Sequence, residues 1–290
     1  MTVIASSSIS GAAKKRYARV LSIAGSDSGG GAGIQADLKT CAALGCYGMT
    51  AITAITVQNT LGVTGIHGIP LDTVRGQIDA VVQDIGVDAV KIGMLATPDV
   101  VSVVADAIRR HGIRNVVLDP VMVATSGDRL IVPETAQALV QELFPLATVI
   151  TPNLDEAALL LGRSIDGIAA LDAAVADLLA MGAPAVLLKG GHLSGDLVMD
   201  VLGRQGRQAG DYLRLQSQRI VTHNGHGTGC TLSSAIASFL AQGLALEAAV
   251  TEARSYILGA IEAGAEVYTG QGHGPLNHGY APRAQLIVEG

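Results

Sequence analysis

The sequence has few aromatic residues and little positive charge. It contains no tryptophan, aromatic residues make up 3% of it, and its formal net charge is -6. Proteins that bind nucleic acids usually carry a basic surface or aromatic side chains that stack on bases. The longest run of basic residues is Lys14, Lys15 and Arg16, so we do not expect nucleic acid as a partner.

Long apolar runs and a disulfide framework are also missing. No apolar stretch approaches the roughly 18 residues typical of a membrane span, and the N-terminus lacks the apolar core of a secretory signal. The three cysteines, Cys41, Cys46 and Cys230, are too few and too unevenly spaced for a disulfide framework. We therefore expect a cytoplasmic protein without a membrane partner.

Residues 1–17 are rich in Ser and Ala and contain no acidic residue. A transit peptide has such a composition, but arginine is scarce and the stretch is short, so we expect a disordered tail. The remainder, residues 18–290, shows no linker and is expected to form a single domain. With 36 glycines and 49% hydrophobic residues, its composition suits a buried α/β core with many tight turns.

From about residue 18, short β-branched runs alternate with longer amphipathic ones. Val20–Ala24 is predicted to be a strand, and Gly33–Leu44 a helix whose apolar residues recur at spacings of three and four. Further strands are expected at residues 47–57, 89–92, 115–118, 148–151 and 184–189, and helices at 70–85, 98–110 and 133–143. Repeated strand–helix units predict a doubly wound α/β fold with a mostly parallel sheet.

The pattern changes after residue 189. Residues 197–202 and 212–215 flank a glycine-containing turn and predict a small antiparallel edge of the sheet. Two alanine-rich helices are then expected at residues 228–240 and 246–263. The fold class expected from these elements is α/β, with a mostly parallel central sheet and a small antiparallel edge.

The common phosphate-binding motifs are missing from this α/β pattern. No lysine follows a glycine, so there is no Walker A sequence, and the glycine-rich residues 29–33 lack the G-x-G-x-x-G spacing. These absences argue against a P-loop protein and against a dinucleotide-dependent oxidoreductase.

A glycine-rich turn, His226-Gly227-Thr228-Gly229-Cys230-Thr231, stands directly before the helix expected at 228–240. Such a turn directs backbone N–H groups and the positive end of the helix dipole at one place, which suits a transferring phosphoryl group. Cys230 lies where the same dipole favours a thiolate, which could accept a proton from an attacking alcohol. Alternatively, the glycines only allow close packing around an inert, buried cysteine.

Four polar residues follow the ends of predicted strands, where ligands bind in open parallel sheets. Asp119 and Glu156 could hold a hydrated Mg²⁺, which needs few carboxylates. Lys189 and Asn153 would lie on the ATP side, with Lys189 able to reach a phosphate. Asn153 could also cap a helix, with Glu156 completing a capping box, and this local role does not exclude a functional one.

A second glycine-rich loop, Ser26–Gly33, follows the first predicted strand and lies at the same end of the sheet. A loop of this kind could line a small-molecule pocket. Asp37 and Gln58 could supply polar contacts to the ligand, and Met94 an apolar one. Taken singly, each of these residues is more often a surface, capping or core residue.

Several of these residues belong to short runs that occur in the same order in one enzyme family. The runs are 21–27 (LSIAGSD), 30–40 (GGAGIQADLKT), 58–60 (QNT), 91–95 (KIGML), 119–123 (DPVMV), 151–153 with 156–157 (TPN, EA), 188–192 (LKGGH) and 226–233 (HGTGCTLS). Over about residues 18–281, the sequence resembles the hydroxymethylpyrimidine/phosphomethylpyrimidine kinases of thiamine biosynthesis.

This resemblance implies a ribokinase-like three-layer α/β/α fold, usually as a homodimer. It also implies ATP and Mg²⁺ as cofactors and two successive phosphorylations, first of 4-amino-5-hydroxymethyl-2-methylpyrimidine and then of its monophosphate. Two alternatives stay open: a pyridoxal or pyridoxine kinase on the same fold, and a pyrimidine-binding protein without catalytic activity.

The resemblance also implies roles for individual residues on the substrate side. Gln58 would bond the amino group of the pyrimidine, and Asp37, Met94 and Val121 would line its pocket. The family often has a lysine where this sequence has Thr125, a departure that could alter how the second phosphate is held.

On the phosphate side, the resemblance implies that Lys189 contacts the phosphates of ATP. Gly227, Thr228 and Gly229 would form an anion hole. Cys230 would stand where most ribokinase-like enzymes have an aspartate base.

Overall fold

The computed structural model describes residues 15–123, 131–191, 193 and 195–289. Its main strands are β2 (Arg19–Asp27), β3 (Tyr47–Asn59), β4 (Gly62–Gly68), β5 (Ala89–Ile92), β6 (Val116–Leu118), β7 (Val149–Ile150), β8 (Ala185–Leu188), β9 (Leu197–Arg204) and β10 (Leu213–Gln218). Its α-helices are α1 (Gly33–Ala43), α2 (Leu71–Asp84), α3 (Pro98–His111), α4 (Pro133–Ala138), α5 (Leu154–Leu161), α6 (Leu171–Ala180), α7 (Thr228–Ala241) and α8 (Leu246–Gly264).

These strands form one sheet in the order β10-β9-β8-β7-β6-β5-β2-β3-β4. The strands from β3 to β8 in this order run parallel, while β4 at one edge and β9 and β10 at the other are antiparallel to their neighbours. The predicted mostly parallel sheet with an antiparallel edge is therefore confirmed. The chain leaves β2 first toward β3 and later returns to its other side as β5, and ligands bind at such a switch point in open α/β sheets.

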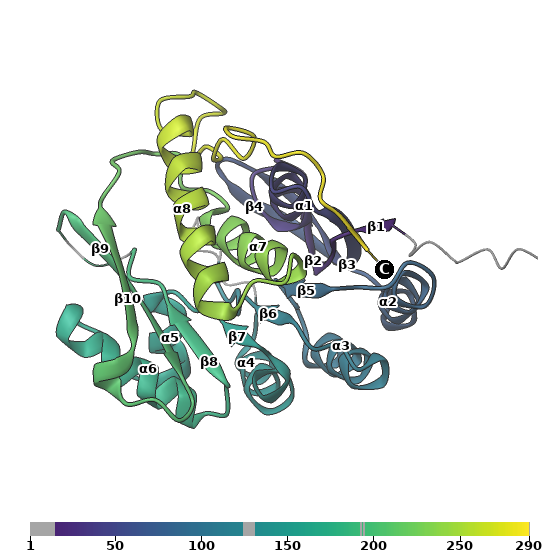
Figure 1. Cartoon of the computed structure of the whole chain (residues 1–290), viewed down its shortest axis with the longest axis horizontal. Helices are drawn as coiled ribbons and strands as arrows, with labels where there is room; N and C mark the ends of the chain where they lie inside the picture. Colours follow the sequence, from purple (N-terminus) through teal and green to yellow (C-terminus); the bar gives the residue numbers. More distant parts are fainter. Residues whose placement is uncertain (1–14, 124–130, 192, 194, 290) are drawn as a thin grey trace, which may run out of the picture.

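Both faces of the sheet are buried, which makes the fold three-layered (Figure 1). Successive side chains of a strand point to opposite faces. In β6, Val116 and Leu118 pack in the core formed with helices α2 to α6, whereas Val117 packs in the core formed with α1, α7 and α8. Continuous apolar strands such as β6 are typical of a parallel sheet covered on both sides.

The predicted elements coincide with the observed ones to within a few residues, apart from one helix. The helix expected at 133–143 is α4 followed by a π-helical turn, Leu139–Leu143. The start of α3 shows why the local signals work: Thr97 accepts a hydrogen bond from the Val100 amide, and Pro98 occupies the first turn. Within the described residues, no helix combines the length and apolar character that a membrane span needs.

The expected tail, residues 1–17, is too long by at least three residues. Lys15–Tyr17 forms strand β1, which pairs antiparallel with β11 (Ile287–Glu289). The Arg16 guanidinium also donates a hydrogen bond to Asp88 at 2.7 Å. Residues 1–14 lie outside the described residues, so the rest of that expectation stays a prediction.

Three further elements of the main fold were not predicted from the sequence. Strand β4 contains three glycines and lacks a regular alternation of apolar and polar residues. Helix α6 buries Leu171, Ala174, Val175, Leu178 and Leu179 at helical spacing, but alanines on its exposed side reduce the contrast between its two faces. Helix α5 is marked by Asn153 and Glu156 at its start and by Gly162 at its end, but its eight residues are too few to show a clear period.

The C-terminal segment is anchored on α7 and α8 by His278. The ring Nε2 of His278 lies 3.0 Å from the Thr231 hydroxyl, and its carbonyl accepts a hydrogen bond from the Tyr256 hydroxyl at 2.6 Å. Burial, aided by the charge of Lys39, lowers the pKa of His278 from 6.5 to about 4. The buried ring is therefore neutral at neutral pH.

This pKa predicts a loss of stability in mild acid. Below about pH 6.5 the unfolded chain binds a proton at His278 that the folded chain rejects until about pH 4, so the free energy of unfolding falls across this window by up to about 3 kcal/mol. We expect His278→Asn to remove this part of the decline in urea unfolding at pH 7.5 and pH 5. The same variant of exposed His67 is the control, and an equal decline in both variants would contradict the assignment.

Candidate active site

Polar side chains from three neighbouring strands meet at the carboxyl edge of the sheet. Asp119 follows β6, Thr151 follows β7 and Lys189 follows β8. The Lys189 ammonium donates to Asp119 Oδ1 at 2.9 Å, and the Thr151 hydroxyl donates to the same oxygen at 3.0 Å. Asp119 is almost fully buried, whereas the Lys189 side chain keeps 14% of its surface exposed. The expected proximity of Asp119 and Lys189 is confirmed.

Lys189 is protonated and positively charged in this position. Burial alone would lower its pKa, but the neighbouring carboxylates of Asp119 and Glu156 outweigh burial and raise it. The ammonium is therefore available to a phosphate group that reaches the exposed part of its side chain.

Glu156 and Asn153 form the capping box that the sequence predicts at the start of α5. Asn153 Oδ1 accepts from the Glu156 amide at 2.9 Å, and Glu156 Oε2 accepts from the Asn153 amide at 2.8 Å. Burial raises the pKa of Glu156 to about 7, with the Lys189 charge opposing and the Asp119 charge adding to the rise. Asp119 and Glu156 are thus two buried carboxyl groups close enough to affect each other, which fits a hydrated Mg²⁺ that keeps several waters and needs few protein ligands.

The glycine-rich turn before α7 lies beside this cluster. Gly227 has φ +83°, and a Cβ on Gly229 would lie 3.1 Å from the Lys189 Nζ and 3.3 Å from Asp119 Oδ2. Thr228, Gly229 and Cys230 are partly exposed. The turn therefore offers the first amides of a 14-residue helix next to a lysine and an aspartate. The first N–H groups of a helix have no partner within it, although the Thr228 amide donates to the Gly225 carbonyl at 3.3 Å.

Cys230 lies in the first turn of α7, as expected, but the expected thiolate is wrong for the free protein. The residue keeps some exposure, yet burial of the thiol raises its pKa to about 11. The Lys91 charge and an amide hydrogen bond from Gly33 oppose this rise without reversing it. With its pKa at about 11, Cys230 is a neutral thiol at neutral pH.

Asp37 belongs to a closed polar cluster beneath the turn. Lys91 donates to both carboxylate oxygens of Asp37 at 2.8 and 2.9 Å, and the hydroxyls of Ser22 and Ser234 donate at 2.5 and 2.6 Å. Lys91 and Asp37 have side-chain exposures of 0% and 1%. With its oxygens occupied and hidden from solvent, Asp37 supports the site from below instead of presenting a polar group at its surface.

The other expected substrate-side residues lie at the same edge of the sheet. Gln58, at the end of β3, is half-buried, and its amide contacts Thr56 and His226 at 3.0 and 3.4 Å. Met94 follows β5 and lies against Gly25, where a Cβ would meet its Cε at 2.9 Å. Val121 is half-buried after β6. Thr125 lies outside the described residues.

Three residues of the site went unassigned in the sequence. Asp27 organises the first glycine-rich loop, because its carboxylate accepts from the amides of Gly29, Gly31 and Ala32 at 2.7 to 3.0 Å. The Nε2 of His226, in the loop before α7, lies 2.9 Å from that carboxylate. Lys91 is fully buried. Asp27 and His226 stood in or beside glycine-rich motifs and within the runs shared with the kinase family, and these positions were the signals for them.

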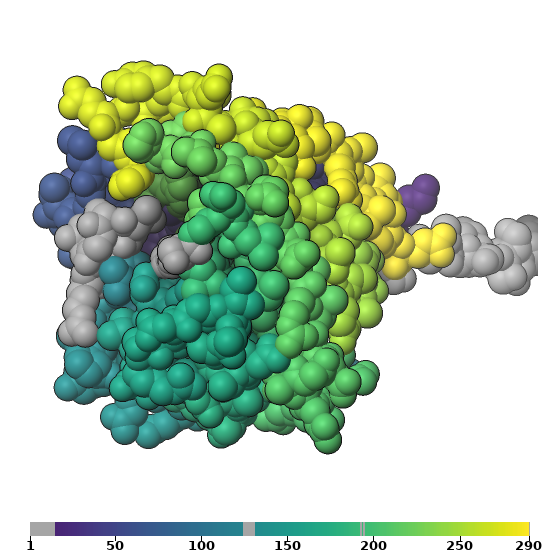
Figure 2. Space-filling model, turned by 90° about the vertical axis from the view of Figure 1, so that its left-hand side faces the viewer, coloured from purple at the N-terminus to yellow at the C-terminus, as the bar shows by residue number. Residues whose placement is uncertain are grey.

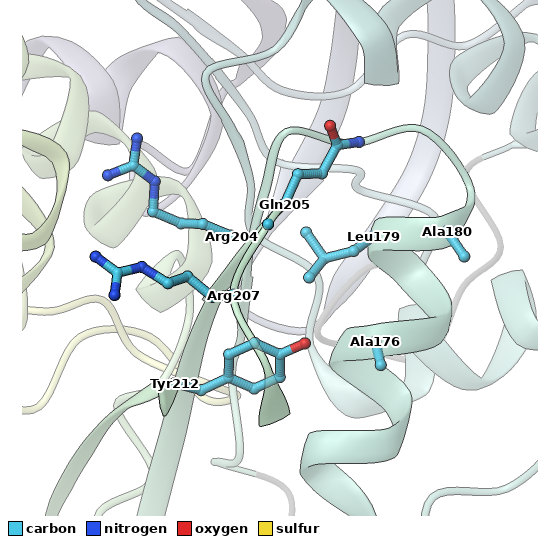
Figure 3. A pocket seen from close by; sticks show the side chains of 8 residues that line it. Ala176, Leu179, Ala180, Arg204, Gln205, Arg207 and Tyr212 are labelled. Carbon is cyan, nitrogen blue, oxygen red and sulfur yellow. The ribbon is translucent and has the colours of Figure 1, made fainter. Parts of the chain in front are cut away.

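A separate hollow of about 330 Å³ lies between α6 and the turn after β9 (Figure 3). Arg204 at its rim pairs in register with Ala185, the first residue of β8, so this hollow is at the amino edge of the sheet. Lys189 follows the last residue of the same strand. Figure 3 shows the guanidinium groups of Arg204 and Arg207 directed away from α6, and the hollow holds none of the expected site residues.

The face drawn in Figure 2 is made up of segments from the N-terminal, middle and C-terminal thirds of the chain. The contacts of the candidate site likewise join residues that are far apart in sequence. His226 and Asp27, for example, are separated by 199 positions.

Comparison with known proteins agrees with this geometry. The family model described as phosphomethylpyrimidine kinase matches residues 27–277. The hydroxymethylpyrimidine/phosphomethylpyrimidine kinase of Rhizobium meliloti is 54% identical over 260 residues, which cover 89% of this chain and 96% of the relative. The enzyme of that name from Escherichia coli is 45% identical over 276 residues, covering 90% of this chain and 97% of the relative.

Solved structures show the same fold. A phosphomethylpyrimidine kinase from Clostridium difficile superposes with a TM-score of 0.73 at 41% identity, covering 84% of this chain and 99% of the other. A pyridoxal kinase from Bacillus subtilis, solved as an ADP complex, gives a TM-score of 0.83 at 40% identity, covering 91% of this chain and 98% of the other. The ribokinase-like fold is thereby confirmed, and the chain belongs to the phosphomethylpyrimidine kinase family.

Proposed function

We propose that the protein transfers the γ-phosphate of ATP to the hydroxymethyl group of 4-amino-5-hydroxymethyl-2-methylpyrimidine, and then phosphorylates the monophosphate to the diphosphate. The observation that carries this proposal is the position of the α7 turn beside the Lys189–Asp119 pair. That arrangement places backbone amides, an ammonium group and a carboxylate around one small volume, as phosphoryl transfer requires.

In this proposal the amides of Gly227, Thr228 and Gly229 hold the equatorial oxygens of the transferring phosphoryl group. Lys189 neutralises part of the charge on the phosphates of ATP, with Asn153 beside it on the nucleotide side. The transition state of such transfers is loose, so catalysis depends mainly on positioning and on charge neutralisation.

Asp119 and Glu156 would hold Mg²⁺, which when bound neutralises charge on the phosphates. Glu156 titrates near neutrality in the free protein because it is buried. Lys189 lies on Asp119 in the free protein and has an exposed face, so its ammonium can shift its contact from the carboxylate to a phosphate.

Cys230 would lie next to the hydroxymethyl oxygen and receive its proton. Because burial holds the pKa of the thiol at about 11, the thiolate is a minor species at neutral pH and grows with pH. In a loose transition state the alcohol loses its proton late, so little assistance is needed before the new P–O bond forms.

We expect Cys230→Ala to lower kcat roughly 100-fold while changing the KM values for both substrates much less. The wild-type kcat should rise between pH 7 and pH 9, and the variant should lose this rise. The assay couples ADP release to the pyrimidine alcohol and identifies one or two added phosphates by mass. Cys46→Ala, a change at a cysteine buried against the far end of α7, serves as the control. A Cys230→Ala enzyme with normal turnover would exclude Cys230 as the proton acceptor.

Pyridoxal kinase activity is the second candidate. The structural similarity to the Bacillus subtilis pyridoxal kinase favours it, since that likeness extends over 91% of this chain. Comparing kcat/KM for the pyrimidine alcohol and for pyridoxal in one preparation separates the two activities. A larger value for pyridoxal would reverse the assignment.

We propose a homodimer built on the β3–β4 edge of the sheet. Ile55 and Val57 lie on one face of β3 there, with 40% and 63% of their surface exposed, and Leu61 in the turn after it is 64% exposed, although all three are apolar. An apolar patch of this kind on a sheet edge is typical of an interface. Light scattering that gives a monomer mass would contradict the dimer.

We place the protein in the cytoplasm, since its three cysteines are free thiols.

The anion cradle, formed by the amides of Gly227, Thr228 and Gly229, depends on Gly227. Its φ of +83° is unfavourable for a residue with a side chain, and a Cβ there would lie 1.9 Å from the Gly31 carbonyl oxygen. We expect Gly227→Ala to lower the free energy of unfolding by at least about 1 kcal/mol and to abolish most activity.

The matched control is Gly76→Ala in the middle of α2, where a Cβ would meet nothing within 4 Å. This variant should gain about 0.5 to 1 kcal/mol, because alanine favours a helix over glycine. Thermal unfolding and the coupled assay compare the two variants. Full activity in Gly227→Ala would show that the cradle does not need this backbone conformation.

A further inference from the structure

The imidazole of His226 lies where three segments of the site meet. Its Nε2 is 2.9 Å from Asp27 Oδ2 at the end of β2 and 3.4 Å from the side-chain amide of Gln58 at the end of β3. Its own backbone leads directly into Gly227 and the anion cradle. The residue is 9% exposed, and its ring leaves no room for a side chain on Gly31. His226 therefore connects the substrate side of the site to the phosphate side.

The proton on His226 can be assigned from its neighbours. Burial raises the pKa of Asp27, but hydrogen bonds from His226 and from the amides of Ala32 and Gly29 outweigh burial and lower it. Asp27 is therefore an ionised carboxylate that only accepts hydrogen bonds. At 2.9 Å from such an oxygen, the His226 Nε2 must carry a hydrogen. This single hydrogen is donated mainly to Asp27 and shared, as a three-centre hydrogen bond, with the Gln58 side chain at 3.4 Å.

The hydroxyl of Thr56 fixes the other side of Gln58. Thr56 has one hydroxyl hydrogen, and it donates this hydrogen to the Ser26 carbonyl at 2.8 Å. Its oxygen can then only accept from the Gln58 amide, 3.0 Å away. The group of Gln58 that faces Thr56 must therefore be the NH₂ group, and the group that faces His226 must be the carbonyl oxygen.

The structure places Oε1 of Gln58 toward Thr56 and Nε2 toward His226. A half turn of the amide exchanges the two groups, satisfies both neighbours and moves no other atom. With Nε2 toward His226 instead, two donors would face each other on one side and two acceptors on the other. The network of neighbouring donors and acceptors decides the orientation of an amide. Here both neighbours select the same one.

We propose that His226 is a positioning residue that fixes the carbonyl oxygen of Gln58 toward the α7 loop, where it accepts a hydrogen bond from the ring amino group of the substrate. The inference rests on the proposed function and deepens it. An aminopyrimidine presents a hydrogen-bond donor to this oxygen. A pyridine alcohol with an ionised ring hydroxyl would present an acceptor and gain nothing from this orientation.

The test compares His226→Met, which removes the donor, with His226→Gln, whose amide nitrogen can reach the position of Nε2. In the ATP-coupled assay, we expect His226→Met to raise the KM for the pyrimidine alcohol about tenfold, since one buried hydrogen bond is lost. The KM for ATP should stay within about twofold. His226→Gln should restore most of the affinity for the alcohol.

A double-mutant cycle with Gln58→Ala separates positioning from simple packing. If His226 acts through Gln58, the double variant His226→Met/Gln58→Ala should have the same KM as Gln58→Ala alone. If His226 only packs the loops together, the two effects should multiply, which would overturn the proposal. An unchanged KM in His226→Met would overturn it as well.

The same assay distinguishes a failure of the proposed function from a failure of the role assigned to His226. A wild-type enzyme that releases no ADP with the pyrimidine alcohol would overturn both proposals, whereas wild-type turnover without the expected change in the variants overturns only the role of His226. Should His226→Met fail to fold in a thermal unfolding measurement, His226→Asn takes its place. Asparagine is polar but too short to reach Gln58, so it should show the same tenfold rise.

Discussion

The site depends on a main-chain contact between two glycine-rich loops from opposite ends of the chain. A Cβ on Gly227 would lie 1.9 Å from the Gly31 carbonyl oxygen, so the two backbones touch where a side chain could not fit. Glycine alone allows such an approach together with φ +83°. The contact joins the loop after β2, which borders Gln58, to the amides at the start of α7. In the proposed mechanism, recognition of the ring and retention of the phosphate would thereby fall within one small volume, as transfer between two substrates requires.

Two buried ammonium–carboxylate pairs surround this contact, and their different exposure indicates different roles. Lys91 and Asp37 are closed off from solvent and are further satisfied by two serine hydroxyls. A buried pair of this kind is costly to break, because either charge alone would be left without a partner. Asp119 and Lys189 follow the ends of β6 and β8, and the lysine retains 14% exposure. The first pair is therefore a fixed support near Cys230, whereas in the proposed mechanism the second would exchange partners when a nucleotide binds.

Much of the fold and part of the site could be predicted from the sequence, because their signals are local. Apolar periodicity located the parallel strands and most helices, and the ends of β6 and β8 then brought Asp119 and Lys189 together. Pairings between distant segments were not accessible: strand β1 needs β11, more than 260 residues away, and no local pattern marks either. The burial of individual side chains could not be predicted either. Burial raises the pKa of Cys230, so the expected thiolate is absent at neutral pH, and it removes Asp37 from solvent. Prediction from the sequence therefore failed where the pairing, burial or pKa of a residue depends on neighbours that are remote in sequence.

In the proposed mechanism, the first amides of α7 hold the transferring phosphate beside Cys230. A crystal structure with a non-hydrolysable ATP analogue, Mg²⁺ and the pyrimidine alcohol would show this contact. We expect the terminal phosphate within hydrogen-bonding distance of the amides of residues 227–230, with the hydroxymethyl oxygen next to the Cys230 sulfur. A terminal phosphate bound away from this turn, for instance near Arg204 and Arg207 at the opposite edge of the sheet, would contradict it.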